Sequence, residues 1–304
     1  MQTFDVALLT DRRYTASTAA DGDWYLSNIL ADDRLLQEAL ASRGLTSLRV
    51  DWADPAIEWS RFRCGVFRTT WDYFERSAEF SAWLERVENE TRLCNCGSTV
   101  RWNSDKHYLA DLAALGVPVV PSRFLERGSP QTLAGVLAET GWDESVIKPC
   151  VSGAARHTYR VNRRTATQFQ PRLSSLLAGE SMIVQPFQSD IIRTGEDSLM
   201  VFGGRYSHAV RKVAKRGDFR VQDDHGGTVH EYRPTGDQIA LAEQAVAACQ
   251  PLPVYGRVDM VRDGGRLAVM ELELIEPELW LRYHPPAAER FAECVVALLQ
   301  RNLS

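Results

Sequence analysis

Two hydrophobic patterns alternate over the first third of the chain. Short apolar runs, typical of buried strands, are followed by segments in which apolar residues recur every three or four positions, as on one face of a helix. This order of strands and helices predicts a parallel sheet with helices on both faces, a small doubly wound α/β domain. The predicted strands are residues 4–10, 45–51 and 64–70, and the predicted helices are residues 28–42 and 77–88.

Beyond this domain the pattern changes to strands joined by turns, with fewer helices between them, which favours an α+β arrangement. A helix is expected to start at Asn103 or Ser104 and to end at Gly116, and another runs from Ser129-Pro130 to Gly141. The changes of pattern suggest three units, which are residues 1–97, 98–180 and 181–304. Further strands are predicted at 144–149, 181–187, 199–203, 206–213 and in a hairpin over 255–277, with helices at 235–250 and 287–303.

Composition and charge narrow the class of protein. A hydrophobic content of 44% and a charged content of 25% are ordinary for a soluble globular chain, and a net charge of −5 argues against general affinity for nucleic acid. No apolar run approaches the length of a membrane span, and the N-terminus lacks the basic start of a signal peptide. The six dispersed cysteines suggest reduced, buried thiols, so we expect a cytoplasmic protein. A homo-oligomer is compatible with the sequence.

The predicted C-terminal hairpin carries three carboxylates, Asp259, Glu271 and Glu273. Glu271 and Glu273 are two positions apart on one strand, so they point to the same face. Because carboxylates among valine, methionine and leucine are costly to bury without a partner, the pattern favours a hard cation such as Mg²⁺ with phosphate oxygens. The alternative is an exposed acidic face on an edge strand.

The length of the hairpin turn decides where Asp259 points. A three-residue loop at 263–265 pairs Asp259 with Val269 and places Asp259 on the face of Glu271. A two-residue loop would place Asp259 on the opposite face. The three-residue loop is therefore the predicted register.

Cations and small residues are scattered over the preceding segments. Lys106 is expected in the first turn of a helix, where a cation opposes the helix dipole, and Lys148 lies on a strand before the small-residue loop at Ser152-Gly153. Such a loop lets backbone N–H groups approach phosphates, although a plain turn would use the same residues. The strand end at 185–187 and the polar loop at 215–228 are a candidate purine slot and a candidate lid.

Ligands of doubly wound sheets bind at the carboxyl ends of strands. Asp11, Thr70 and Asp72 follow predicted strands of the first domain and are therefore candidate substrate contacts. Trp71 and Tyr73 in the same loop either contact substrate or pack at a domain seam.

From about residue 101 onward the chain resembles the ATP-grasp superfamily, in its glutathione-synthetase-like and ribosomal-protein glutamate-ligase-like branch. The matching motifs are N-S-D-K-H, V-I-K-P, V-Q-P-F, G-E-D-S, R-K-V-A-K-R-G-D-F-R, H-G-G and D-M-V…M-E-L-E-L-I-E-P. The resemblance implies a pre-grasp domain followed by two subdomains that clasp ATP. It also implies roles: Lys106, Lys148, Ser152, Gly153, Gln185, Pro186, Phe187 and Glu196 bind ATP, Asp259, Glu271 and Glu273 hold two Mg²⁺ (Mn²⁺ is possible), and Lys212 and Arg220 act on the transferred phosphoryl group.

Two positions depart from this family. Glu273 stands where the last metal ligand is usually Asn, and Glu276 stands where Ser usually precedes the proline. Because Glu276 lies where substrate would sit, the substrate of glutathione synthesis does not carry over.

The blocks F-G-G-R-Y-S-H-A-V-R-K, G-D-F-R-V-Q and E-L-E-L-I-E-P resemble the small ATP-grasp ligases of cycloserine biosynthesis. This narrower likeness implies an amino-acid-like substrate, O-ureidoserine, that is cyclised through an acylphosphate. Arg257, on the face of Asp259, is a candidate to grip the substrate carboxylate or acylphosphate. The alternatives are another ATP-grasp amino-acid or peptide ligase, an ATP-grasp small-molecule kinase, or a nucleotide sensor without turnover.

Overall fold

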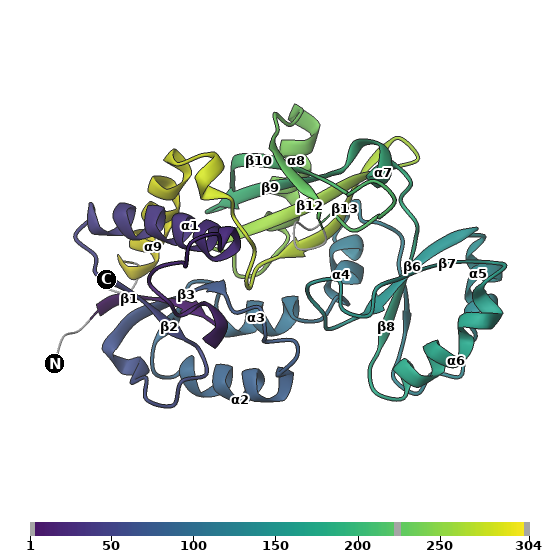
Figure 1. Cartoon of the computed structure of the whole chain (residues 1–304), viewed down its shortest axis with the longest axis horizontal. Coiled ribbons are helices and arrows are strands. Elements are labelled where there is room, and N and C mark those ends of the chain that lie inside the picture. The colour runs from purple at the N-terminus through teal and green to yellow at the C-terminus, as the bar shows by residue number, and fades with distance from the viewer. Residues whose placement is uncertain (1–3, 222–225, 301–304) are drawn as a thin grey trace.

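The strands of the computed structural model, which describes residues 4–221 and 226–300, form three separate sheets (Figure 1). The first is a parallel sheet in the order β2-β1-β3-β4. Alternate residues of β1 pack on opposite faces, Leu8 with Leu36 of α1 and Leu9 in the cluster that holds Trp83 of α2. The doubly wound domain is therefore confirmed. Its elements are β1 (Phe4–Thr10), η1 (Arg12–Tyr14), α1 (Trp24–Ala41), β2 (Ser47–Asp51), η2 (Trp59–Arg61), β3 (Phe62–Thr69), α2 (Ser77–Val87) and β4 (Arg92–Leu93).

The central sheet is antiparallel, in the order β5-β8-β6-β7, and two helices cover one of its faces. Ile147 points into the core beneath these helices, whereas its neighbours Val146 and Lys148 point to the opposite face. This alternation along β6 leaves a polar face for a ligand. The elements are β5 (Arg123–Leu125), α5 (Leu133–Thr140), β6 (Glu144–Pro149), β7 (Tyr159–Asn162), α6 (Ala166–Leu177) and β8 (Met182–Pro186).

The C-terminal sheet has the order β11-β10-β9-β12-β13 and is antiparallel throughout. Helices α4 and α8 pack on one face, where Leu109 and Ala245 share a core with Val258 and Val269. The elements are α3 (Gly97–Asn103), α4 (Tyr108–Ala114), α7 (Asp190–Thr194), β9 (Glu196–Phe202), β10 (Arg205–Val213), β11 (Thr228–Glu231), α8 (Gly236–Ala247), β12 (Tyr255–Asp263), β13 (Arg266–Glu273), η4 (Leu281–Tyr283) and α9 (Pro286–Gln300).

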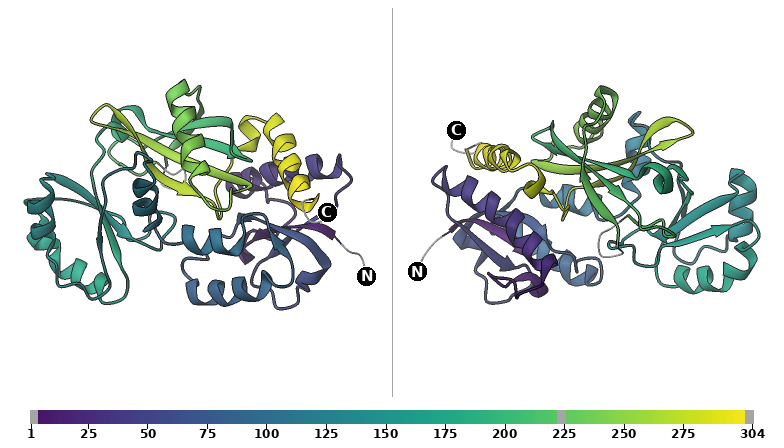
Figure 2. Two further views of the ribbon diagram at one scale, coloured as in Figure 1. Left: turned by 180° about the vertical axis from the view of Figure 1, so that it is seen from behind. Right: turned by 45° about the horizontal axis from the view of Figure 1, so that its top comes forward.

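The last helix returns to the first domain. Figures 1 and 2 both show the yellow helix α9 beside the purple helix α1, and the two helices are in contact. Phe291 of α9 and Leu40 of α1 belong to one buried cluster that also contains Phe202 of β9. The parallel domain and the C-terminal sheet therefore share a core, which fixes their relative position. No helix within the described ranges is long and apolar enough to cross a bilayer.

Two local predictions are wrong. Neither Asn103 nor Ser104 caps the following helix, because Asn103 is the last residue of α3, Ser104 is the C-cap of α3, and α4 begins at Tyr108. The Asn103 side chain instead bonds to β13, donating to the Leu272 carbonyl and accepting from the Leu274 N–H. The boundary at residue 180 would separate β8 from the central sheet, whereas β8 pairs with both β5 and β6. The short strand β7 and the helix α6 were not predicted.

Candidate functional site

A cavity of about 350 Å³ lies where the three sheets meet. Side chains reach it from the loops of the parallel domain, from the polar face of the central sheet and from β10, β12 and β13. Every residue that the sequence predicts to bind ATP or metal, or to act on the phosphoryl group, lines this cavity. These residues are Lys106, Lys148, Ser152, Gly153, Gln185, Pro186, Phe187, Glu196, Lys212, Arg220, Arg257, Asp259, Glu271 and Glu273.

The hairpin of β12 and β13 brings Asp259 to the face of Glu271 by a route other than the predicted one. The loop has two residues, since Asp263 pairs with Arg266, and Gly264 and Gly265 both have positive φ, as a tight hairpin turn requires. A regular ladder from this turn would place Asp259 opposite Met270. A β-bulge between Asp259 and Met260 shifts the register by one, so Asp259 pairs with Glu271. The predicted three-residue loop is wrong, and the bulge restores the predicted face.

Asp259 is the centre of a buried ion network. Its carboxylate is 2.8 Å from the Lys212 Nζ and accepts two hydrogen bonds from Arg257, at 2.9 and 3.0 Å. The Ser198 hydroxyl on the neighbouring strand β9 donates to it at 2.6 Å. Burial alone would raise the pKa of Asp259, but Arg257 and Lys212 outweigh it and hold that pKa well below its usual value. Asp259 is therefore ionised and fixed in orientation.

Glu271 joins the C-terminal sheet to two lysines outside it. Its carboxylate is 3.0 Å from the Nζ of Lys106, which precedes α4, and 3.4 Å from the Nζ of Lys148 on β6. Burial raises the pKa of Glu271, yet the two lysines lower it to about 2. The Lys106 Nζ also donates to the Ser152 carbonyl at 2.7 Å. Lys106 and Lys148 therefore both contact Glu271, a carboxylate that is suited to bind a metal ion, on the wall of the cavity.

Glu273 and Glu196 complete the acidic set. Glu273 is bonded to Arg257, and burial together with Asp259 and Glu271 raises its pKa to about 7 despite that arginine. Glu196, on β9, is 2.5 Å from the Lys212 Nζ, and burial raises its pKa. Glu196 and Glu273 therefore share the cations of Asp259.

The candidate purine slot at residues 185–187 lies between the central sheet and the loop that follows β10. Gln185 is buried and its amide donates to the Ser122 hydroxyl at 3.0 Å. The Phe187 ring is 3.7 Å below the Arg160 guanidinium and meets the Phe219 ring edge-on at 5.9 Å. Aromatic and apolar groups of this kind suit the flat face of a base.

The small-residue loop after β6 contacts the parallel domain. A Cβ built on Gly153 would come within 2.6 Å of the Phe74 ring, so only glycine fits beneath that ring. Ala154 and Ala155 have φ values of 48° and 53°, a left-handed conformation that is uncommon for residues other than glycine. Such strain is found at ligand-binding loops.

Arg220 lies on the predicted lid and forms an ion pair with Asp218 at 2.7 Å. It lines the cavity together with Phe219 and Val221. The prediction of a lid extends over residues 222–225, which lie outside the described residues.

The structure does not place the three predicted substrate residues on the cavity wall. Asp11 is fully buried and holds Arg13 through two side-chain bonds, and Asp72 accepts from Trp52 and Arg76. Thr70 is also fully buried, and its hydroxyl has no partner within the described part of the chain. Neighbouring side chains reach the cavity instead: Arg13, Tyr14, Tyr25, Trp71 and Tyr73.

Sequence reasoning missed Arg13, Tyr14, Tyr25, Ser198 and Trp280. Ser198 shares the face of Asp259, and the G-E-D-S motif contained it, so its spacing from Glu196 was a usable signal. Trp280 lies 5.0 Å from the Arg257 guanidinium. The contacts of Arg13 and Tyr25 depend on how loops pack, and no sequence pattern signalled them.

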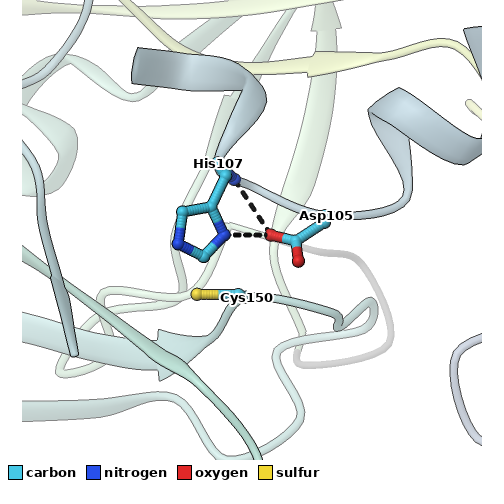
Figure 3. Close-up of side chains that lie close together, drawn as sticks. All are labelled: Asp105, His107 and Cys150. Atoms are coloured by element: carbon cyan, nitrogen blue, oxygen red, sulfur yellow. Dashed lines mark hydrogen bonds and ion pairs between the residues drawn. The ribbon is translucent and has the colours of Figure 1, made fainter. Parts of the chain in front are cut away.

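A second polar cluster consists of Asp105, His107 and Cys150 (Figure 3). The His107 ring is bonded through Nδ1 to Asp105 at 2.5 Å and through Nε2 to Glu126 at 3.0 Å, and these carboxylates raise its pKa against the effect of burial. Burial raises the pKa of the Cys150 thiol to about 12. Both ring nitrogens of His107 are already bonded to carboxylates and the Cys150 thiol is held in its neutral form, so the cluster is poorly suited to bind a metal ion. The cluster instead anchors the turn that contains Lys106. The Lys106 backbone N–H donates to the Cys150 carbonyl at 2.9 Å.

The carboxylate face fits a divalent metal ion in its donor chemistry. Asp259, Glu271 and Glu273 offer only oxygen, the ligand that Mg²⁺ prefers, and they line the same cavity as the lysines. Each carboxylate is bonded to a lysine or an arginine. Residues of both charges are therefore in place for a metal ion and for phosphates.

Comparison with known proteins agrees with this geometry. Residues 6–95 match the family described as the N-terminal domain of D-cycloserine synthetase DcsG. The chain is 40% identical to the cycloserine biosynthesis protein DcsG of Streptomyces lavendulae, over 87% of this chain and 93% of that protein. The crystal structure of D-cycloserine synthetase DcsG superposes with a TM-score of 0.84 at 37% identity, covering 97% of this chain and 99% of the other.

A more distant structure shares the fold alone. The RimK domain ATP-grasp protein of Sphaerobacter thermophilus is 20% identical, with a TM-score of 0.66 over 95% of this chain and 98% of its own. The chain therefore belongs to the ATP-grasp ligases, enzymes that form carbon–nitrogen bonds with ATP, and within them to the family of the D-cycloserine synthetase DcsG.

Proposed function

We propose that this protein cyclises an O-ureidoserine in an ATP-dependent reaction that forms cycloserine. Two observations support the proposal. A relative of known role is similar to most of the chain, and the cavity contains both cationic side chains suited to phosphate and carboxylates suited to a metal ion. The observation that carries it is the position of Glu271, whose carboxylate contacts both Lys106 and Lys148. This arrangement suits a metal-bound triphosphate between the central and C-terminal sheets.

The reaction has three steps. A carboxylate oxygen of the substrate attacks the γ-phosphorus of ATP, the bond from that phosphorus to the oxygen of ADP breaks, and an acylphosphate forms. The ureido nitrogen next to the side-chain oxygen then attacks the acyl carbon and loses its proton, phosphate leaves, and a ring closes that still carries the carbamoyl group on this nitrogen. Water then cleaves the bond from the ring nitrogen to the carbamoyl carbon, releasing carbon dioxide and ammonia, and the nitrogen takes up a proton to give cycloserine. Arg257 is held by Asp259 and Glu273 at the cavity wall, where a guanidinium stabilises the charge of a carboxylate or an acylphosphate.

The remaining assignments follow the family pattern. Lys106 and Lys148 neutralise the α- and β-phosphates, the backbone at Ser152 and Gly153 approaches them, and Lys212 and Arg220 act on the transferred group. Residues 185–187 line the adenine and Glu196 holds the ribose. Asp259, Glu271 and Glu273 hold two Mg²⁺, for which Mn²⁺ could substitute, and a bound metal ion supplies charge neutralisation and Lewis acidity.

The site of action is part of the proposal. All six cysteines are free thiols and four of them are buried, as is common in the reducing cytoplasm. We place the reaction there, on a free amino acid rather than on a nucleic acid or a membrane component.

The test is a turnover assay with ATP, Mg²⁺ and either enantiomer of O-ureidoserine. We expect ADP and phosphate to appear together with the cyclised product, detected by mass spectrometry. ADP with a stable phosphate ester and no free phosphate would indicate a kinase instead. Turnover with a second amino acid as nucleophile, and none with O-ureidoserine alone, would indicate a ligase that joins two molecules.

A further inference from the structure

Glu276 differs from the other acidic residues of the cavity wall. The carboxylates of Asp259, Glu271 and Glu273 each contact a lysine or an arginine. Glu276 lines the same cavity and is partly buried, yet within residues 4–221 and 226–300 no ion pair joins its carboxylate to a lysine or an arginine, and its hydrogen bond is to its own backbone. A partly buried carboxylate without a cationic partner is unfavourable, so a cation supplied by a ligand would stabilise it.

The surroundings of Glu276 belong to the end of the cavity that the parallel domain forms. The Trp71 Nε1 donates to the Glu276 backbone carbonyl at 2.9 Å, which holds the indole beside this residue. The Tyr14 and Tyr25 rings contact Trp71, at 5.4 and 5.9 Å between ring centroids. Negative ring faces beside a carboxylate attract an organic cation.

The cation is better described as an ammonium group than as a metal ion. A metal site would require further oxygen donors around Glu276, whereas the neighbours from the parallel domain are aromatic rings and Arg13, whose charge is paired with that of Asp11. The lysines and Arg257, which attract phosphate, are already bonded to the three other carboxylates. Charge thus divides the cavity into a phosphate end and an end that favours a positive group.

We propose that Glu276, beside the Trp71 ring, binds the α-ammonium group of the amino-acid substrate and so makes the enzyme selective for substrates with a free amino group. This inference rests on the proposed function, since it assumes that the acylated molecule is an amino acid. Contact with the ammonium group holds one end of the substrate while its carboxylate faces Arg257.

The experiment compares the wild type with Glu276→Gln in steady-state ADP release, using O-ureidoserine and its analogue in which hydrogen replaces the amino group. Loss of a charged hydrogen bond is expected to raise the KM for O-ureidoserine by about 10- to 100-fold, with the KM for ATP within about twofold. The wild type should disfavour the analogue by a similar factor, and Glu276→Gln should lose that preference. Glu75→Gln, at an exposed rim position, is the matched control and should keep the wild-type KM.

Equal KM values for O-ureidoserine in the wild type and Glu276→Gln would overturn the inference. A change in Mg²⁺ requirement with an unchanged substrate KM would also overturn it, because Glu276 would then serve a metal ion. Should Glu276→Gln fail to fold, Glu276→Asp keeps the charge, and the preference of the wild type for O-ureidoserine over the analogue decides the matter.

Failure of the proposed function would be seen separately, as an absence of cyclised product with the wild type. Calorimetric binding of O-ureidoserine and of the analogue in the presence of ATP would then still test the ammonium contact. Equal affinities for the two compounds would overturn it.

Discussion

Asp259 lies directly opposite Glu271 on strands β12 and β13, although the two-residue turn between these strands would bring Met270 to that place. The bulge that restores the pairing puts both carboxylates on one face, toward the cavity. Bulges often reorient a side chain beside a functional site. The face that carries both carboxylates thus depends on one irregular position in an otherwise regular hairpin.

Asp259→Asn should destabilise the protein as well as inactivate it. The change leaves Lys212 and Arg257 buried without their shared ionised partner, although Glu196 and Glu273 still contact them. Breaking a buried ion network by removing one partner costs roughly 3 kcal/mol. Chemical denaturation measures this cost, and Asp218→Asn, which breaks the ion pair with Arg220 near the surface, should cost less than about 1 kcal/mol. Equal losses in the two variants would contradict the network described for Asp259.

Gly153→Ala should weaken ATP binding. The added Cβ meets the Phe74 ring within 2.6 Å, so the loop or the ring must move. A displacement of this size in the proposed phosphate-binding loop is expected to reduce kcat/KM for ATP by about 10- to 100-fold. Steady-state kinetics measures the change.

Replacing Phe74 provides the control for that experiment. Phe74→Leu shortens the side chain that the new methyl group meets, so the double variant should recover part of the lost activity. No recovery would mean that the glycine is required for a reason other than its contact with Phe74.

Stability should fall as the solution is acidified from about pH 7 toward pH 4, in part because of His208. The pKa of His208 is lowered to about 4, mainly by burial and also by the nearby His284. The hydrogen bond to the Leu279 carbonyl raises this pKa but does not offset burial. An ordinary histidine has a pKa of about 6.5, so the unfolded chain binds this proton first, and the folded state loses up to about 3 kcal/mol between pH 6.5 and 4. Thermal unfolding at several pH values measures the loss.

His208→Gln should reduce this pH dependence, since the glutamine amide can still donate to Leu279 and does not titrate. His230→Gln, on the exposed strand β11, should leave the dependence unchanged. The same slope in the wild type and His208→Gln would show that other groups cause the acid sensitivity.

Regular hydrophobic spacing made much of the fold predictable. The strands β1 and β6 begin and end at the predicted residues, and the parallel domain follows from alternating strands and helices. The register of the hairpin was not predictable, because a bulge leaves no pattern in apolar spacing. Only tertiary packing shows that Asn103 bonds to β13 rather than capping a helix.

The candidate site divides in the same way. Motifs located the lysines and carboxylates because ATP chemistry requires these residue types in a set order along the chain. The substrate end depends on loops of the parallel domain, whose contacts are set by packing. The sequence therefore indicated Asp11, Thr70 and Asp72, whereas the adjacent residues Arg13 and Trp71 line the cavity.

The most direct test of the account is the rate of ADP formation by Glu271→Gln with ATP, Mg²⁺ and O-ureidoserine. We propose that Glu271, which contacts Lys106 and Lys148, holds the metal ion of ATP, so its loss should lower kcat by about 100-fold or more while the melting curve remains cooperative. Glu139→Gln, on the exposed side of α5, should retain wild-type activity. A Glu271→Gln protein that turns over at the wild-type rate would contradict the metal-bound triphosphate on which the account depends.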